Sequence, residues 1–575
     1  MVQAEAVEDG GLQVMPVNPV LDDVPAEFIG GAEGVSGLET FLFSLRSRRG
    51  SNLLGGHFMR RLFRRKSLDA IVDETREPHR QLKRALGPVH LTLFGVGAII
   101  GAGIFSTVGT AAAGGADHIG AGPAIMVSFL IMAPICALAG LCYAEFASMA
   151  PASGSAYTYA YATLGELVAW IIGWDLILEY AVGNVAVAIS WSGYFQVLLH
   201  HNWPGWLGVD FRSALQAAGT VADAAARHVD LSTLDAGVLR AAQAWQDAPH
   251  VLGVPIIFNL PAFAIVMLLT WVLVIGIQES ARFNSVMVVV KLVILLFFLI
   301  MGAFYIKPQN WTPFAPHGLK GIASGAAVIF FAYIGFDAVS TAAEETRQPQ
   351  RDMPIGILGS LGICTLIYVA VAVVLTGMLP SSQLDTAEPL ATAFTGLGLN
   401  WAAAIISVGA LLATTSGLLV FQLGQTRIFF SMARDGLLPP WAAAVHPKYR
   451  TPHLSTLLTG LLVAAFAGVT NIAEVVELCN IGTAFAFMLV AAGIIILRRT
   501  EPGRPRGFKT PWVPWVPMVS ILSCGWLMAA MPRVTWLRFG IWLVVGLAFY
   551  FCHGFWRSKL RTGADGQAKG AATGS

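Results

Sequence analysis

The sequence predicts an all-α integral membrane protein with about 12 transmembrane helices. Hydrophobic residues make up 55% of the 575 residues and charged residues only 12%, and the mean hydropathy is +0.66. The apolar residues gather in runs of roughly twenty, the length that crosses a bilayer core about 30 Å thick. A large soluble protein can be as apolar in total, but its apolar residues are not arranged in such runs.

The expected spans follow one another with mostly short connections. They lie at 89–114, 122–149, 164–199, 253–277, 283–306, 320–343, 355–379, 400–432, 454–470, 474–497, 513–531 and 535–556. Two of them, 164–199 and 400–432, are longer than a bilayer requires, so we expect them to tilt or to project beyond the lipid.

Basic residues indicate the orientation of these spans. The connections expected on one side hold most of the loop arginines and lysines, including Arg434, Arg498 and Arg499, whereas those on the other side hold few. By the positive-inside rule the basic side is cytoplasmic, and an even number of spans then places both termini in the cytoplasm. We therefore expect a multi-pass protein of the cell (inner) membrane.

Hydrophilic segments divide the chain around this membrane domain. We expect a cytoplasmic amino-terminal tail at 1–85, a transmembrane domain at 86–557 and a cytoplasmic carboxy-terminal tail at 558–575. An Ala- and Asp-rich insertion at 200–252 is expected outside the cytoplasm and partly helical. The tail shows no signal-peptide pattern. Its basic cluster, Arg60–Lys66, suits anionic lipid, with a specific partner site as the alternative.

Glycines interrupt two of the spans at their middles, at matching positions in the two halves of the chain. The first interruption is Gly97–Phe105, with Gly101 and Gly103, and the second is Phe330–Asp337. An unwound helix in lipid leaves backbone groups without partners, each costing several kcal/mol, unless something polar uses them. Paired interruptions of this kind indicate the substrate site of a secondary transporter. Close helix packing at small residues is the alternative.

Free amides make the first interruption a suitable seat for an anion. A half-helix that begins near Gly101 would direct bare N–H groups and the positive end of its dipole toward the bilayer centre. A carboxylate binds well at such a helix start.

Two intramembrane acids are candidate site residues. Asp337 lies about two helical turns, roughly 10 Å, from Glu344 at the span end, too far for an aspartate to reach water. The alternative is that it caps the helix that resumes after Gly335. Glu179, with Asp175 one turn before it, could neutralise a cationic substrate side chain or pair with a fixed lysine.

Lys291 is the basic residue that lies deepest within an expected span. It lies roughly 12 Å by helical rise from the cytoplasmic end of its span, and a lysine stem reaches only ~6 Å. We therefore expect it to point into the bundle and to exchange protons. There it could replace a sodium ion against carbonyls of the first interruption and the hydroxyls of Thr414, Thr415 and Ser416. A permanent internal salt bridge is the alternative.

These stretches, together with Gly173–Tyr180 and the continuation of the second interruption to Glu345, carry a family resemblance. From about Leu86 to Trp556 the chain resembles the cationic amino acid transporter family, in its shorter bacterial form, within the amino acid–polyamine–organocation superfamily. The resemblance implies an inverted repeat of five plus five helices, with helices 1 and 6 broken, and two further helices at the end.

The resemblance also implies roles for individual residues. The substrate carboxylate would meet the backbone of Gly101, Ala102 and Gly103, although several bacterial members have a hydroxyl residue where Ala102 stands. The amino group would meet carbonyls near Ile99 and around Phe331 and Ile334. Phe331 would act as a gate, Asp337 and Glu179 would line or support the site, and Lys291 would couple a proton.

The function we expect is secondary active transport of amino acids across the plasma membrane, by proton-coupled symport and alternating access, with a possible cationic preference. An exchanger, or a substrate-sensing receptor without net transport, is the alternative. No metal-spaced His/Cys cluster or nucleophile with a base suggests an enzyme. We expect no metal and no cofactor beyond the proton, and amino acid and membrane lipid rather than nucleic acid as partners.

Overall fold

The computed structural model describes residues 62–68, 86–115, 118–149, 154–199, 204–227, 236–251, 254–275, 281–449 and 451–560. The chain divides into residues 1–59 and 60–575, and every described residue belongs to the second unit. Most of the expected amino-terminal tail and residues 561–575 of the carboxy-terminal tail therefore lie outside the described residues.

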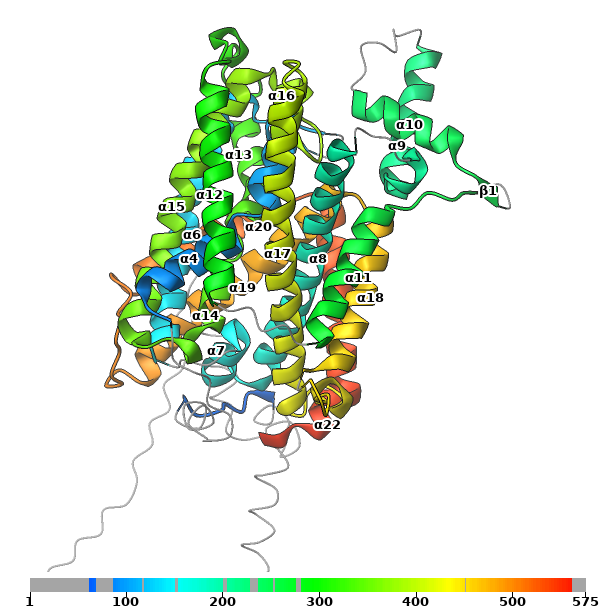
Figure 1. Ribbon diagram of the computed structural model, residues 1–575. Coiled ribbons are helices and arrows are strands. Elements are labelled where there is room, and N and C mark those ends of the chain that lie inside the picture. The colour runs from blue at the N-terminus through cyan, green and yellow to red at the C-terminus, as the bar shows by residue number, and fades with distance from the viewer. Residues whose placement is uncertain are drawn as a thin grey trace, which may run out of the picture. The chain divides into compact units, whose positions relative to one another are not determined.

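Long apolar helices dominate this unit (Figure 1). Eight of them, among the described residues, are long and apolar enough to cross a membrane. They are α6 with its preceding turn (Gly122–Met149), α8 (Glu166–Leu198), α12 (Ala281–Ala303), the span Gly318–Thr341, α15 (Pro349–Met378), α17 (Asn400–Arg434), α19 (Ile472–Thr500) and the final span Arg533–Arg557.

A broken helix and three shorter helices complete the expected set. The first span consists of α4 (Pro88–Ile99) and a second half, Gly103–Ala113, bent by 44° from it. The shorter apolar helices are α11 (Leu260–Ile275), α18 (His453–Val469) and α20 (Trp515–Ala529). The expected all-helical multi-pass architecture is confirmed.

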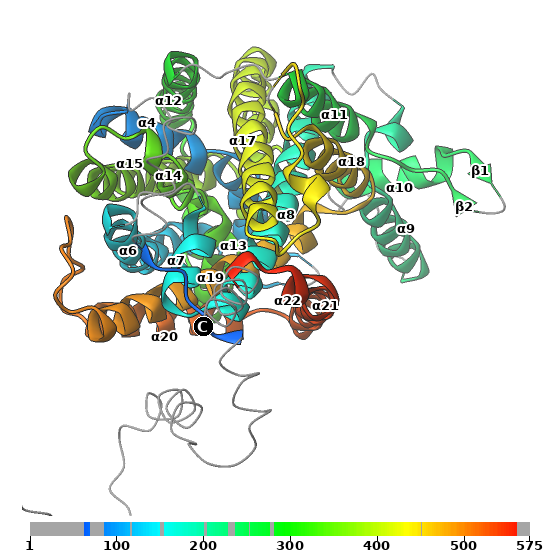
Figure 2. The same ribbon diagram turned by 90° about the horizontal axis from the view of Figure 1, so that it is seen from below.

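Burial separates helices that face lipid from helices that face protein. Along α12, Val286, Val289, Val293, Leu296 and Ile300 are all more than half exposed. These positions recur at helical spacing, so they form one apolar face that hydrocarbon would cover. In contrast, no residue of α8 is exposed, and the helix lies within the bundle, against α17 and α19. Figure 2 shows α8 and α17 together near the middle.

Glycines allow the central helices to approach closely. A Cβ atom at Gly424 of α17 would lie 2.6 Å from the ring of Tyr180 on α8, and one at Gly183 would lie 3.0 Å from the ring of Phe421. The first distance is too short for a real Cβ atom and the second is tighter than most Cβ contacts, so small residues here set the distance between the two longest helices.

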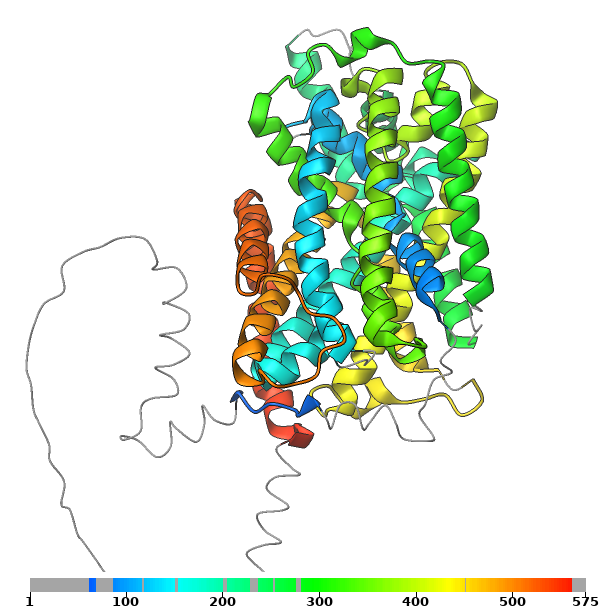
Figure 3. The same ribbon diagram turned by 90° about the vertical axis from the view of Figure 1, so that its left-hand side faces the viewer.

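The remaining spans flank this centre. α15 packs against α4 and α6, and α20 packs against α6 and α19. α21 (Arg533–Phe549) continues through a short π-helix, Tyr550–Gly554, into α22 (Phe555–Arg557). Figure 3 shows the last spans together at one flank of the bundle.

The insertion between α8 and α11 is partly helical, as predicted. It contains α9 (Phe211–Ala226), α10 (Ala236–Asp247) and two short antiparallel strands, β1 (His250–Val251) and β2 (Val254–Pro255). Asp210 caps α9 by accepting a hydrogen bond from the Ser213 amide at 2.8 Å. Arg212 pairs with Glu474 of α19 at 2.6 Å and so connects the insertion to the bundle.

The described part of the amino-terminal tail, residues 62–68, runs along the opposite, lower end of the bundle in Figure 1. The Lys66 ammonium pairs with Asp435 at 3.1 Å, and the Tyr157 hydroxyl of α7 (Ser155–Thr163) donates to the same carboxylate at 2.7 Å. Arg64 donates to the carbonyl of Leu560. Two charges of the basic cluster that we interpreted as lipid-binding therefore contact the protein itself.

Two expected boundaries are wrong. The fourth span was expected to begin at 253, but residues 254–255 form β2 and α11 begins at Leu260. The seventh span was expected at 355–379, but α15 begins at Pro349. A proline is disfavoured in a helix interior. Pro349 and Pro354 both lie near the start of the helix, where a proline ring removes few hydrogen bonds or none, so the helix tolerates them.

Candidate functional site

Both predicted interruptions are present. The first span leaves helical geometry at Ile100, which has an extended backbone, and resumes as a π-helix, Gly103–Thr107, followed by α5 (Val108–Ala113). The sixth span runs as α13 (Gly318–Ile329) and a 3-10 turn, Phe330–Tyr333.

Beyond that turn the sixth span is unwound. Ile334 is extended and Gly335 has a φ of +116°, a conformation that favours glycine. The span resumes as the short helix α14 (Ala338–Thr341).

The two interruptions contact each other through their glycines. A Cβ atom at Gly335 would lie 2.8 Å from the carbonyl oxygen of Ala98, and one at Gly103 would overlap the backbone of Ala332. Gly103 therefore serves the close packing that we gave as the alternative for these glycines. Backbone contact between the unwound segments places their freed peptide groups in one buried region.

Lys291 binds the freed carbonyls of the first interruption. Its ammonium donates to the carbonyl of Gly97 at 2.7 Å and to that of Ile100 at 3.1 Å. The side chain is fully buried, so it points into the bundle as predicted. The hydroxyls expected beside it donate to carbonyls of their own helix: Thr414 to Ala410, Thr415 to Leu411 and Ser416 to Ala413.

The backbone amides of the first interruption are available to bind a ligand. Among the described residues, no acceptor is found for the N–H groups of Gly101, Ala102 and Gly103. Gly101 is itself buried, yet a Cβ atom there would have no neighbour within 4 Å. Free amides beside enclosed open space are what a bound carboxylate requires.

Asp337 stabilises the second interruption. One carboxylate oxygen accepts from the Gly335 amide at 3.2 Å and the other from the Tyr180 hydroxyl at 3.3 Å. Although Asp337 holds the capping position of α14, its side chain makes no capping bond to that helix. The capping alternative is therefore wrong in detail, because the carboxylate reaches back across the turn instead.

Glu179 lies in a buried group of acids. Its side chain has a hydrogen bond with Thr483, and Asp175 and Asp337 are close enough to interact with it electrostatically. Within the described chain no lysine or arginine pairs with Glu179, so the alternative of a fixed internal lysine partner finds no support there. Asp175 is fully buried, and neither of its carboxylate oxygens has a hydrogen-bond partner among the described residues.

Phe331 and Ile334 complete the predicted set. Phe331 is 4% exposed and Ile334 is 2% exposed. Both belong to the second interruption itself, Phe331 in the 3-10 turn and Ile334 at its end. With Ile99 at the end of α4, they give the region apolar side chains beside its backbone polar groups.

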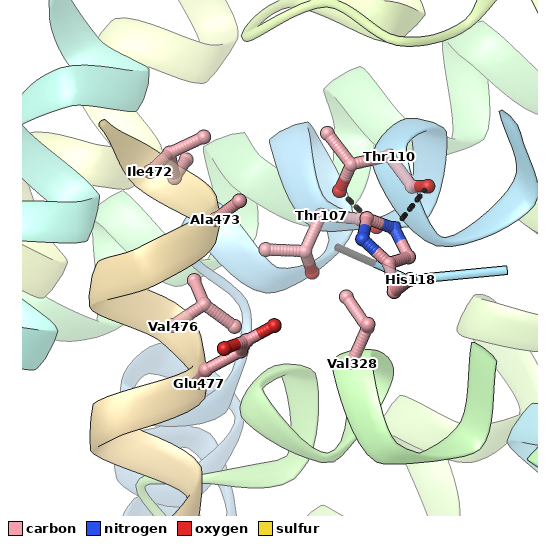
Figure 4. A pocket seen from close by; sticks show the side chains of 8 residues that line it. All are labelled: Thr107, Thr110, His118, Val328, Ile472, Ala473, Val476 and Glu477. Atoms are coloured by element: carbon pink, nitrogen blue, oxygen red, sulfur yellow. Dashed lines mark hydrogen bonds between the residues drawn. The ribbon is translucent and has the colours of Figure 1, made fainter. Parts of the chain in front are cut away.

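A pocket opens between the second half of the first span, the first half of the sixth span and the start of α19 (Figure 4). It is lined by Thr107, Thr110, His118, Val328, Ile472, Ala473, Val476 and Glu477. Thr107 follows the first interruption and Val328 precedes the second. The pocket therefore lies beside the two interruptions rather than between them.

Sequence reasoning missed two residues that hold the interruptions. The Tyr368 hydroxyl of α15 lies 2.9 Å from the carbonyl oxygens of both Ile99 and Ala332. Asn480 of α19 donates to the carbonyls of Ala327 and Val328 at 2.8 and 3.3 Å. A polar side chain within an apolar span is a usable signal, since its hydrogen-bonding groups need partners there.

No metal centre accompanies these residues. Within the described ranges, no group of three or more His, Cys, Asp and Glu side chains is arranged to hold a metal ion. The site is built instead from backbone groups, one lysine, acids and hydroxyls.

Comparison with known proteins places this architecture in a family. Residues 86–549 match the model of a family described as amino acid permease. The branched-chain amino acid permease BcaP of Bacillus subtilis (strain 168) is 44% identical over 500 residues, covering 87% of this chain and 99% of that protein. The methylthioribose transporter of the same organism is 43% identical, with 86% and 98% covered.

A plant relative is also similar. The vacuolar cationic amino acid transporter 4 of Arabidopsis thaliana is 37% identical, covering 77% of this chain and 68% of that protein. The family and these relatives are transporters, not enzymes, and the predicted resemblance is confirmed. The chain therefore belongs to the amino acid permease family, within the amino acid–polyamine–organocation superfamily.

Proposed function

We propose that this permease carries an amino acid together with a proton across the cell membrane by alternating access, with both termini in the cytoplasm. The observation that carries the proposal is the arrangement at the first interruption. The free amides of Gly101, Ala102 and Gly103 offer a seat for the substrate carboxylate. Carbonyls of the two interruptions offer acceptors for its amino group, and Glu179 supports the site from α8.

The preferred substrate in this proposal has an uncharged side chain. Both carboxylate oxygens of Asp337 already accept hydrogen bonds from the protein, so this acid is poorly placed to neutralise a cationic side chain. Phe331 and Ile334 supply apolar surface. The relatives at 43–44% identity are named for branched-chain amino acids and for methylthioribose, and those named for cationic amino acids are less similar among the relatives compared. We therefore propose that branched-chain amino acids are the preferred substrates and that cationic amino acids bind less well.

We propose that Lys291 couples the proton, because its ammonium group binds two carbonyls of the first interruption. A charged ammonium has three N–H donors, and two of them bind the carbonyls of Gly97 and Ile100. Loss of the proton would remove the positive charge that strengthens both hydrogen bonds, and so would weaken the hold on the first span. The protonation state would then bias the position of α4 and with it the side to which the site opens.

Purified protein in proteoliposomes tests the function. With an inward proton gradient, uptake of radiolabelled leucine should exceed its equilibrium level, and collapsing the gradient should abolish accumulation. Competition by isoleucine, valine, lysine, arginine and methylthioribose ranks the substrates. Uptake that requires internal amino acid and ignores the gradient would identify an exchanger. Binding without uptake would identify a receptor.

Lys291→Gln tests the coupling role. The glutamine amide can still donate to a carbonyl but cannot carry a proton between states. We expect leucine exchange to persist while gradient-driven accumulation falls at least about tenfold and the pH dependence of uptake flattens. Lys307, in the connection after α12, provides the control, because Lys307→Gln should leave the pH profile unchanged. An unaltered pH profile in Lys291→Gln would remove Lys291 from the mechanism.

A further inference from the structure

A line of polar side chains on α19 leads inward from the pocket. Glu477 lines the pocket, Asn480 lies about one turn deeper and Thr483 about one turn deeper again. Steps of three residues keep neighbouring side chains near one face of the helix, and the line covers about 9 Å of it. Asn480 and Thr483 are 1% and 0% exposed, so polar groups continue from the pocket into the protein interior.

Asn480 forms the floor of the pocket. Its amide nitrogen donates to the carbonyls of Ala327 and Val328, and Val328 is one of the residues that line the pocket. The amide oxygen of Asn480 is buried and has no hydrogen-bond partner among the described residues. A buried acceptor of this kind costs free energy in a membrane interior unless a donor reaches it. A water molecule that enters from the pocket can supply that donor.

The pocket suits water rather than an amino acid. Its volume is about 10 Å³, about the least that holds one water molecule. The Glu477 carboxylate, two threonine hydroxyls and the His118 ring supply polar groups along its wall (Figure 4). The start of α19 is also joined to the insertion, because Glu474 pairs with Arg212. The pocket therefore lies at the end of the bundle that faces outward in the proposed orientation.

The line ends at a buried acid of α8. The Glu179 side chain has a hydrogen bond with Thr483, whose hydroxyl also donates to the carbonyl of Cys479 at 3.0 Å. A hydroxyl can accept a proton from one neighbour and release its own to another, so Thr483 can pass a proton to the acid. The titratable groups near Glu179 are Asp175 and Tyr180 of α8, Tyr143 of α6, Asp337 of the sixth span and Cys479 of α19.

These acids and Lys291 border one backbone contact. Asp337 accepts from the Gly335 amide, and a Cβ atom at Gly335 would lie 2.8 Å from the carbonyl oxygen of Ala98 in α4. Lys291 donates to the carbonyl of Gly97, the residue before Ala98. A proton that reaches the acids therefore arrives beside the contact between the two interruptions, where the proposed coupling lysine is held.

We propose that Glu477, Asn480 and Thr483 form the entrance by which protons reach the buried acids from the outer pocket. The inference rests on the proposed proton-coupled function. Asn480 holds a water molecule without changing its own protonation. A hydronium ion in the pocket gives a proton to this water, the water releases one to the Thr483 hydroxyl, and the hydroxyl releases its own to the Glu179 carboxylate. One carboxylate gains a proton and the outer solution loses one.

Thr483→Val tests this route, because valine nearly keeps the shape of threonine and lacks the hydroxyl. In proteoliposomes with the membrane potential held at zero, net leucine uptake driven by an inward proton gradient is compared with leucine exchange at equal pH. Exchange moves no net proton. We expect the ratio of net uptake to exchange to fall at least about tenfold below the wild-type ratio. Thr483→Ser, which restores the hydroxyl, should restore the ratio.

External acid separates slow proton delivery from a structural defect. If protons arrive too slowly, a tenfold higher external proton concentration should recover most of the lost net uptake in Thr483→Val. Asn480→Leu, which removes the amide oxygen, provides a second variant and should show the same fall in the ratio and the same recovery. A loss that acid does not relieve in either variant would show a structural role and overturn the route.

Thr459→Val is the matched control. Thr459 of α18 is also buried, and its hydroxyl donates within its own helix, to Ser455 at 2.8 Å, as that of Thr483 does to Cys479. α18 contributes no residue to the pocket, so we expect the wild-type ratio. A wild-type ratio in both Thr483→Val and Asn480→Leu would also overturn the inference. A wild-type protein that exchanges leucine but never accumulates it on a proton gradient would instead overturn the proposed function.

Discussion

At the scale of single residues, two glycines of the first interruption have different reasons to be glycine. Gly103 packs against the backbone of Ala332, where a Cβ atom has no room, whereas a Cβ atom at Gly101 would enter open space. Neither glycine has a left-handed backbone. Gly103 therefore serves the fold, and Gly101 serves the space proposed for the substrate carboxylate.

Alanine substitution should separate these roles. Gly101→Ala is expected to fold with an unchanged melting temperature and to lower leucine affinity at least about tenfold, because its methyl group takes space from the carboxylate. Gly103→Ala is expected to lose about 1–3 kcal/mol of stability through overpacking. Thermal unfolding in detergent and leucine binding measure the two effects. Wild-type affinity in Gly101→Ala would contradict the proposed seat.

At the scale of elements, Glu145 fixes the connection between α19 and α20. Its carboxylate is fully buried at the end of α6 and pairs with Arg498 at 2.7 Å and with Arg506 at 3.1 Å. It also accepts from the Thr510 amide at 2.8 Å. Arg506 is only 2% exposed. One acid therefore compensates a buried arginine and holds the loop against α6.

Removing this charge should destabilise the protein strongly. In Glu145→Gln the buried Arg506 charge loses its partner, and breaking a buried pair from one side costs about 3–5 kcal/mol. Glu501→Gln is the control, because Glu501 is 42% exposed and pairs with Arg504 within one turn. That change should alter stability by no more than about 0.5 kcal/mol. Equal melting temperatures for the two variants would show that the buried pair contributes little.

The insertion should respond to pH through Asp210. Burial raises the pKa of Asp210 from its usual 3.8 to about 6. Between these pH values Asp210 is deprotonated in the unfolded insertion but still protonated in the folded one. The free energy of unfolding of the insertion therefore falls as pH rises from about 4 to 6, and then stays level. The full change is about 3 kcal/mol. Hydrogen exchange in α9, corrected for intrinsic rate, should show this loss in the wild type and not in Asp210→Asn.

The sequence predicted the helices and their interruptions better than the side-chain contacts between them. Apolar run length located the spans and glycine located the interruptions, because both are local properties. The hydrogen bond of Tyr368 to Ile99 joins residues 269 positions apart, and that of Asn480 to Ala327 joins residues 153 apart. No local pattern encodes such a pairing. The inward position of Lys291 and its contact with the first interruption were predictable because its charge needs a partner, but the two carbonyls that it binds, those of Gly97 and Ile100, were not.

At the scale of the whole molecule, residues 62–68 connect elements that are distant in the sequence. Leu62 and Leu68 are 5% and 2% exposed. Between them Lys66 pairs with Asp435 beyond the end of α17, and the Arg64 carbonyl accepts from the Glu166 amide at the start of α8. This short segment is thus part of the packed bundle, although the chain around it is hydrophilic.

Two truncations should therefore differ sharply. A protein that begins at residue 62 retains these contacts and should keep the wild-type melting temperature. A protein that begins at residue 69 loses two buried leucines, each contributing about 1.5–3 kcal/mol, together with the ion pair, and should melt several degrees lower. Thermal unfolding of the two purified proteins makes the comparison. Identical melting temperatures would show that residues 62–68 do not stabilise the bundle.

The two halves of the sixth span form hydrogen bonds with different helices. Asn480 ties the last turn of α13 to α19, while the Ser340 hydroxyl of α14 donates to Ser155 of α7 at 3.0 Å. Residues 330–337 join the two helices, first as a 3-10 turn and then, at 334–337, as an unwound segment. Spin labels on α13 and α19 should thus keep a constant separation during the transport cycle, whereas labels on α13 and α14 should not. The sixth span would then move as two rigid helices, with all of the bending at the unwound residues 334–337.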